Sequence, residues 1–183
     1  MRIGLMRHYK VSINNNKIWM DSVDFSNWVK QYDQSNIYIN SSFDTKFSWD
    51  VCYSSDMIRA IKTAEAIYKG RIIKTKQLRE IEINPLFDSR MRFHLNVWLI
   101  LGRFGWLLNH PSQENKNSTL LRARAFLDDV EENNQEHHNV LIVSHGAFMT
   151  VLKQELNRRG YRGDKFAKPQ NGRIYTYTRN LCE

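Results

Sequence analysis

A strand–helix–strand pattern between Val51 and Thr75 restricts the possible folds more than any other stretch of this sequence. Residues 51–54 have the composition of a short buried strand, residues 71–75 form a second such run, and apolar residues recur between them at helical spacing. Strands joined in this way run parallel in one sheet, and a parallel sheet needs helices on both faces. The pattern therefore predicts an α/β fold. Ser54 or Ser55 is expected to cap the helix and Gly70 to end it in the left-handed conformation, and its inner face would carry Ile58, Ile61, Ala64 and Tyr68.

The rest of the chain continues the alternation of strands and helices. Residues 140–143 form an uninterrupted apolar run, as expected for a strand that is covered on both faces. Asp21 or Ser22 is expected to cap one helix, Ser118 to open another and Gly160 to end a third. Strands are predicted at 1–6 and, at or near a sheet edge, 173–178; a loop is predicted at 9–19, and helices at 22–33, 119–135 and 147–159. We expect one three-layer α/β/α domain over residues 1–183 with a mostly parallel sheet.

Residues 85–117 interrupt this alternation with an aromatic and irregularly basic segment, in which a helix is predicted between residues 90 and 108. Two interpretations stay open. The segment is either an insertion that caps a ligand cleft or a plain helical layer against the core. Its longest apolar stretch, residues 95–108, is broken by Gly102, Arg103 and Gly105, so no membrane span is predicted.

The formal net charge of +8 favours anionic partners. Lys and Arg are spread along the chain without a nucleic-acid-binding motif, so nucleic acid is not the expected partner. Cys52 and Cys182 lack the spacing of a metal site. Arg2 and Arg7 interrupt the first apolar residues before a signal-peptide core could form, so we expect a cytoplasmic protein that does not enter a membrane.

Two of the predicted strands end in a histidine. Arg7 and His8 follow the first strand, His145 follows residues 140–143, and Arg59 lies near the start of the helix after residues 51–54. Ligands of open α/β sheets bind at the carboxyl ends of the strands, where these side chains would meet. A neutral imidazole can attack phosphorus, and guanidinium groups bind phosphoryl oxygens. The residues therefore favour phosphate chemistry.

Three motifs occur in a characteristic order: Leu5-Met6-Arg7-His8, the sequence SSDMIRAIKTA at residues 54–64, and Val143-Ser144-His145-Gly146. Together they resemble the histidine phosphatase superfamily, also called phosphoglycerate mutase-like. The resemblance implies that His8 is the nucleophile and becomes a phosphohistidine, that Arg7 and Arg59 bind the phosphoryl oxygens, and that His145 completes the catalytic pocket and binds the same group. Two arginines and a protonated histidine would stabilise the transferred group without a metal ion or another cofactor. The cations would also keep His8 neutral.

The family also uses a carboxylic acid in a Leu-x-Glu context soon after the third strand. Leu78-Arg79-Glu80 matches this context, so Glu80 is the candidate general acid, with Glu82 and Asp88 as alternatives. Two departures from the family pattern are present. Tyr9 replaces the usual glycine after the first histidine, so its ring could close one side of the pocket or offer its hydroxyl to substrate. The sequence Ile83-Asn84-Pro85 replaces the family's segment with glycine and tryptophan.

We interpret the sequence as that of a metal-independent phosphatase that hydrolyses small phosphomonoesters through phospho-His8. A phosphoglycerate mutase-type phosphotransferase is the first alternative, and a non-catalytic protein that binds phospho-ligands or nucleic acid is the second. Only residues 179–183 follow the last predicted strand, so we expect no carboxyl-terminal lid and therefore water as the usual acceptor. No oligomeric state is predicted.

Overall fold

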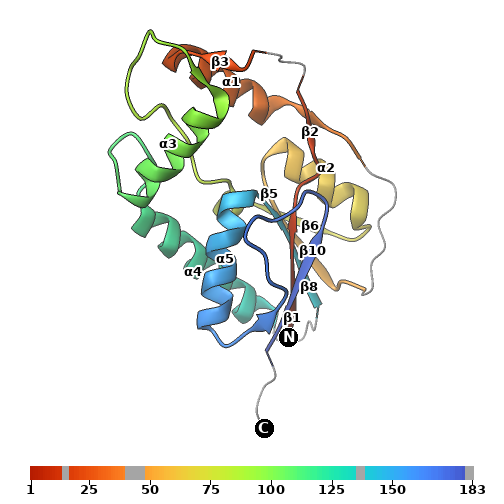
Figure 1. Cartoon of the computed structure of the whole chain (residues 1–183). Coiled ribbons are helices and arrows are strands. Elements are labelled where there is room, and N and C mark those ends of the chain that lie inside the picture. Colours follow the sequence, from red (N-terminus) through yellow and green to blue (C-terminus); the bar gives the residue numbers. More distant parts are fainter. Residues whose placement is uncertain (14–16, 40–47, 135–138, 180–183) are drawn as a thin grey trace.

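The computed structural model describes residues 1–13, 17–39, 48–134 and 139–179 (Figure 1). Within these residues a six-stranded sheet has the order β6-β5-β8-β1-β10-β9. Strands β6, β5, β8 and β1 run parallel, whereas β10 pairs antiparallel with β1 and with β9 at the edge. The strand bounds are β1 Arg2–Arg7, β5 Val51–Ser55, β6 Ile72–Thr75, β8 Asn139–Ser144, β9 Arg162–Gly163 and β10 Ile174–Thr178. The predicted α/β fold with a mostly parallel sheet is confirmed, as is the position of the last strand next to an edge.

Helices cover both faces of this sheet. Successive strand residues point to opposite sides, so the apolar strands place buried side chains on both faces. Ile3 and Leu5 pack with α4 (Lys116–Asn133) and α5 (Gly146–Arg158), whereas Met6 packs with Ala60 and Ala64 of α2 (Ile58–Ile67) on the other face. Strand β8 alternates in the same way, which explains its uninterrupted apolar sequence. Two further helices, α1 (Ser22–Gln34) and α3 (Leu95–Leu107), lie beyond the carboxyl ends of the parallel strands (Figure 1).

Strand β2 (Val11–Ser12) lies within the predicted loop at residues 9–19, and β3 (Trp19–Met20) begins at its last residue. Strand β2 pairs with β4 (Asn36–Ile37), and β3 pairs with β7 (Phe93–His94). Such short strands form because a distant segment supplies the partner, so no local periodicity reveals them. The pairing of β3 with β7 joins the start of α1 to the start of α3.

Several predicted helix ends differ from the structure. Helix α2 stops at Ile67 because Tyr68 leaves the helix and its hydroxyl donates a hydrogen bond to the Asp50 carbonyl at 2.8 Å. Gly70 is not left-handed; among the described glycines, Gly160 and Gly172 have a positive φ. The Ser55 hydroxyl accepts the Met57 N–H in the turn before α2, but the N-cap is Met57, which has no side-chain cap bond.

At the start of two other helices, the capping residue determines where the helix begins. Asp21 caps α1 as predicted, with its carboxylate accepting the Asp24 N–H at 2.8 Å. Helix α4 starts earlier than predicted because Asn115, rather than Ser118, is its cap. The predicted end of that helix at residue 135 lies outside the described residues. Helix α3 begins at Leu95, later than the predicted start at residue 90.

No helix in the described part of the chain has the length and apolar character that a membrane crossing requires.

Candidate active site

His8 and His145 follow two neighbouring parallel strands, which brings their rings together. Arg7 of β1 lies opposite Ser144 of β8, and the His8 N–H donates to the Ser144 carbonyl at 3.0 Å. The two imidazole ring centroids are 5.1 Å apart. The carboxyl edge of the sheet therefore assembles the pair that the sequence predicted.

The surroundings of His8 fix its tautomer and its charge. Nδ1 lies 2.7 Å from the Tyr9 carbonyl oxygen, which can only accept a hydrogen bond, so Nδ1 carries the proton and Nε2 keeps its lone pair. Burial, followed by the positive charge of Arg59, lowers the pKa of His8 from 6.5 to about 3, and Arg7 acts in the same direction. At neutral pH the imidazole is therefore uncharged, with a lone pair available on Nε2.

His145 is neutral as well, which corrects the expectation of a protonated histidine. Its ring is fully buried, and the Arg59 Nε–H donates to Nδ1 at 3.2 Å. Burial and then the charge of Arg59 lower the pKa of His145 well below its ordinary value. With Nδ1 accepting, Nε2 carries the proton, and this buried N–H has no hydrogen-bond partner among the described residues.

Arg7 and Arg59 are held from opposite sides. The Arg7 Nη1 donates to the Pro169 carbonyl at 3.1 Å, whereas its Nε is buried and has no partner within the described chain. The side chain fits because Gly146 starts α5: a Cβ there would lie 3.2 Å from the Arg7 Cζ. Arg59 is buried and donates through Nη1 to the Asp33 carboxylate of α1 at 2.8 Å.

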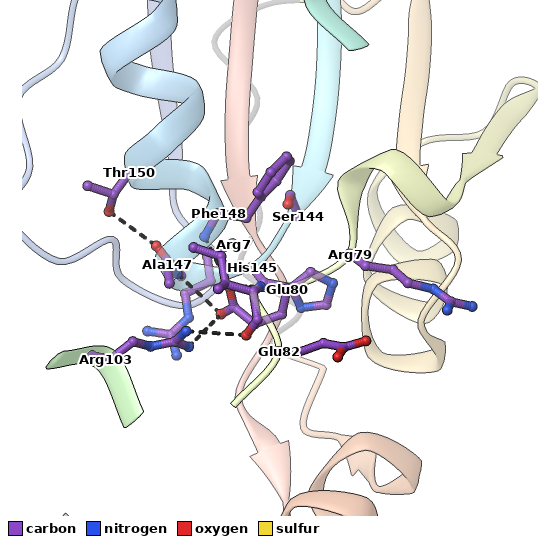
Figure 2. A network of polar contacts seen from close by, with 12 residues as sticks. Arg7, Arg79, Glu80, Glu82, Arg103, Ser144, His145, Ala147, Phe148 and Thr150 are labelled. Atoms are coloured by element: carbon purple, nitrogen blue, oxygen red, sulfur yellow. Dashed lines mark hydrogen bonds and ion pairs between the residues drawn. The ribbon is translucent and has the colours of Figure 1, made fainter. Parts of the chain in front are cut away.

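The Glu80 carboxylate occupies the start of α5 (Figure 2). It follows β6 and the short 3₁₀ helix η1 (Lys76–Leu78), whose Leu78 carbonyl accepts the Ser144 hydroxyl at 2.9 Å. Glu80 Oε1 accepts the Phe148 N–H at 3.0 Å and Oε2 the Ala147 N–H at 3.2 Å. Backbone N–H groups at a helix start stabilise a carboxylate and hold it in place. Arg103 Nη2 of α3 lies 3.7 Å from Oε2.

Glu80 shares a cleft with His8 and both arginines, but its two alternatives, Glu82 and Asp88, do not. A cavity of about 900 Å³ is lined by Arg7, His8, Arg59 and Glu80 together with residues of α1 and α3. Neither Glu82 nor Asp88 is one of the described residues that line this cavity, and both side chains are exposed. Figure 2 shows the Glu82 side chain pointing away from the network around Glu80. Helix α3 forms a wall of this cleft, so residues 85–117 contribute to it directly.

The ring of Tyr9 does not take the place that the sequence suggested. Tyr9 is 4% exposed, packs in the core with Met6 and Ala60, and is not one of the described residues lining the cleft. Its ring also covers Gly172, where a Cβ would come within 2.8 Å of two ring carbons. The ring turns inward because burying an aromatic side chain is favourable, and its backbone carbonyl contacts His8 instead.

Some residues of the site were not identified in the sequence. Asp33 comes from a helix whose pattern indicated only packing, and Arg103 from the segment for which a cleft cap was one of two interpretations. Asn171 donates through its side chain to the His8 carbonyl at 2.8 Å. Arg103 carried a signal, since it is the single charged residue between positions 95 and 108.

The described residues contain no cluster of three or more His, Cys, Asp or Glu that could hold a metal ion. Burial raises the pKa of Cys52 to about 12, so its thiol is unreactive; Cys182 lies outside the described residues.

Comparison with solved structures shows the same fold in several enzymes. The phosphoglycerate mutase from Bacillus anthracis str. Sterne is 21% identical, with a TM-score of 0.65 over 97% of this chain and 90% of that one. The α-ribazole phosphatase from Shigella flexneri is 17% identical, with a TM-score of 0.61 over 99% and 92%. A mycobacterial glucosyl-3-phosphoglycerate phosphatase is 15% identical, with a TM-score of 0.54 over 86% and 79%.

Sequence comparisons give a family assignment. No curated protein sequence matches this chain significantly. The family model of the histidine phosphatase superfamily, branch 1, matches residues 5–178. This range includes Arg7, His8, Arg59, Glu80 and His145. The chain therefore belongs to the histidine phosphatase superfamily.

Proposed function

We propose that this chain is a phosphatase that hydrolyses phosphomonoesters through a phosphohistidine on His8. One observation carries the proposal. The buried Arg7 Nε–H and His145 Nε2–H lack partners among the described residues. The His145 ring centroid lies 5.1 Å from that of His8, and Arg7 lines the same cleft as His8. Buried donors are almost always paired, so their position fits the oxygens of a bound anion.

The first chemical step transfers the phosphoryl group to the protein. His8 Nε2 attacks phosphorus while the bond from phosphorus to the alcohol oxygen breaks, and Glu80 in its acid form protonates the leaving oxygen. Arg7 and Arg59 bind the equatorial oxygens, and His145 Nε2 donates to them. These groups are already fixed by Pro169, Asp33 and the sheet, so little reorganisation is needed as negative charge spreads.

The second step returns the protein to its starting state. Water attacks phosphorus, the carboxylate of Glu80 takes its proton, the bond from phosphorus to Nε2 breaks, and inorganic phosphate leaves. The arginines supply the positive charge, so dialysis against a chelator should leave the rate unchanged. A cytoplasmic location and the lack of nucleic-acid binding stay predictions from the sequence.

The test is turnover of 4-nitrophenyl phosphate by the purified chain and by His8→Ala. We expect His8→Ala to release no phosphate above background, whereas a His110→Ala control, which changes an exposed histidine, should keep the parental rate. Rapidly quenched parent enzyme should carry phosphate that is stable in alkali and lost in acid, as expected for a phosphoramidate. An active His8→Ala variant would contradict the assignment.

The same preparation separates phosphatase from mutase. We supply 3-phosphoglycerate with a bisphosphoglycerate primer and follow the 2-isomer and free phosphate. We expect phosphate release to dominate. Efficient isomerisation with little release would favour the mutase, and tight binding of phosphate without turnover of any ester would favour a non-catalytic binding protein.

A further inference from the structure

The cleft is much larger than the phosphate cluster at its base. Its volume of about 900 Å³ lies at the upper end of the range for small-molecule pockets. Beyond His8 and the arginines, one face of α1 and one face of α3 form two of its walls, and the start of α5 and residues 167–169 also line it. The side chains that form most of these two walls are apolar or aromatic: Trp28, Val29 and Tyr32 on α1, and Ile100, Phe104 and Leu107 on α3.

Helix α3 presents apolar side chains to this space although they are exposed. Ile100 is 64% exposed, Phe104 59% and Leu107 48%, and their spacing places them on one helical face. Contiguous exposed apolar surface is unfavourable in water and commonly marks a binding site. This surface continues into an adjoining cavity of about 230 Å³ between α3 and α5, which is lined in part by Trp106 and Val151.

The opposite face of α3 is fixed to the protein, so the exposed face is a preformed wall. The buried Trp98 ring stacks on Phe25 at 5.6 Å, and its Nε1 donates to the Met20 carbonyl at 2.8 Å. Gly102 packs against Ile83 so closely that a Cβ would lie 2.5 Å from that side chain. A rigid wall needs little ordering when a ligand binds.

Two arginines that line the cleft, Arg59 and Arg103, are already paired with groups of the protein. Arg59 pairs with Asp33, and Arg103 contacts Glu80 and donates to the Ile81 carbonyl at 3.2 Å. Among the described lining residues, the polar side chains farther out include Asn96 and, at the exposed rim, Lys168. The cleft therefore matches one phosphoryl group attached to an apolar body better than a ligand with many hydroxyl or acidic groups.

We propose that the substrates of this site are phosphomonoesters whose alcohol carries an extended apolar group, which packs between α1 and the Ile100, Phe104 and Leu107 face of α3. This inference rests on the proposed function, since it concerns the leaving group of the same reaction. The apolar body binds in both ground and transition state and holds the phosphorus in line with His8 Nε2.

The test is a series of straight-chain alkyl phosphates from ethyl to decyl, each used below the concentration at which it forms micelles. Their leaving alcohols differ little in acidity, so the chemical step is nearly constant and differences in kcat/KM report binding of the chain. We expect kcat/KM to rise about two- to fourfold for each added methylene until the cleft is filled. Glycerol 1-phosphate and glucose 6-phosphate should resemble ethyl phosphate.

The outcomes separate this inference from the proposed function. A series that is hydrolysed at a rate independent of chain length overturns the inference and leaves the phosphatase intact. If no ester in the series and no aryl phosphate is hydrolysed, the proposed function itself fails.

Substitutions at two exposed positions of α3 test whether this helix contacts the alkyl chain. Phe104→Ser should lower the ratio of kcat/KM for octyl phosphate to that for ethyl phosphate about tenfold. The matched control is Val97→Ser, because Val97 is 39% exposed on the same helix but is not among the described lining residues. It should leave the ratio unchanged. An unchanged ratio in Phe104→Ser, together with a dimer of the parent that this variant dissociates, would assign the face to self-association and overturn the inference.

Discussion

Glu80 is the proposed general acid, and its contacts allow a direct test of this role. Its carboxylate is held by two backbone N–H groups of α5, and a glutamine can keep one of these contacts through its amide oxygen. Glu80→Gln should therefore fold normally but lose proton transfer. We expect hydrolysis of alkyl phosphates to slow by about 10²- to 10³-fold and that of 4-nitrophenyl phosphate to slow far less, because nitrophenolate leaves without a proton.

The control for this prediction is Glu82→Gln. Glu82 is exposed, and its side chain points away from the α5 network, so both substrates should keep their rates. Equal losses on alkyl and aryl esters in Glu80→Gln would exclude the role of this carboxyl in leaving-group protonation.

The buried histidines make stability depend on pH. The unfolded chain binds a proton at His8 below pH 6.5, whereas the folded protein does so only near pH 3. Lowering the pH below 6.5 therefore favours the unfolded state, by up to about 1.4 kcal/mol per pH unit for one such group. The lowered pKa of His145 acts in the same direction.

Urea denaturation between pH 7 and pH 5 measures this dependence. We expect the free energy of unfolding to fall across the interval, and His8→Asn to reduce its slope. His110→Asn, at an exposed position, should keep the parental slope. The same slope in His8→Asn as in the parent would contradict a buried, neutral His8.

At the site, the sequence was informative where the function of a residue follows from its place next to a strand or at a helix start. Arg7, His8, Arg59 and His145 are of this kind. Asp33 and Asn171 could not be predicted because their roles depend on how distant segments pack against the strand ends. Tyr9 was misplaced for a related reason: the sequence does not show that the core has room for its ring.

Among the helices, α5 has a glycine at its start and another after its end, and we expect the first to matter for the proposed catalysis and the second for stability. At its start, Gly146 leaves room for the Arg7 guanidinium, and after its end Gly160 adopts a φ of 86°. Gly146→Ala should displace Arg7 and lower kcat/KM for 4-nitrophenyl phosphate by about 10- to 100-fold with little loss of stability. Gly160→Ala should cost about 1 kcal/mol of stability, because side chains disfavour positive φ, and leave kcat/KM unchanged.

The measurements are steady-state kinetics and urea denaturation of both variants. Each variant serves as the control for the other, because they change the same residue type at opposite ends of one helix. Loss of activity without loss of stability in Gly160→Ala would contradict the prediction. Loss of stability without loss of activity in Gly146→Ala would contradict it as well.

Elements with a strong local pattern were predicted well, and elements that depend on a distant partner were not. Strand β8 and helix α1 have clear apolar patterns and, for α1, a cap at Asp21. Strands β2 and β3 have two residues each and exist through pairing with β4 and β7. The end of α2 is set by a contact of Tyr68 with Asp50, which no helical periodicity encodes.

At the scale of the molecule, the residues of the candidate site lie together at one edge of the sheet. The loops and helices that follow β1, β5, β6 and β8 bring His8, Arg59, Glu80 and His145 to the carboxyl ends of the parallel strands, and α1 and α3 add the walls. This arrangement follows from parallel pairing and could be expected from the strand–helix–strand pattern. The apolar character of the walls could not, because it depends on which face of α3 the core leaves uncovered.

The central position of β1 also has a consequence during protein synthesis. Translation delivers β1 before every other strand, but its two neighbours are β8 and β10, with Arg2 opposite Asn139 on one side and Thr178 on the other. His8 is thus synthesised early, and β1 stays without its strand partners until β8 and β10 have been translated. A nascent chain that stops before β8 cannot assemble the phosphate pocket, and one that stops before Pro169 also lacks the carbonyl that holds Arg7. The proposed site can therefore form only after the residues up to Pro169 have been translated.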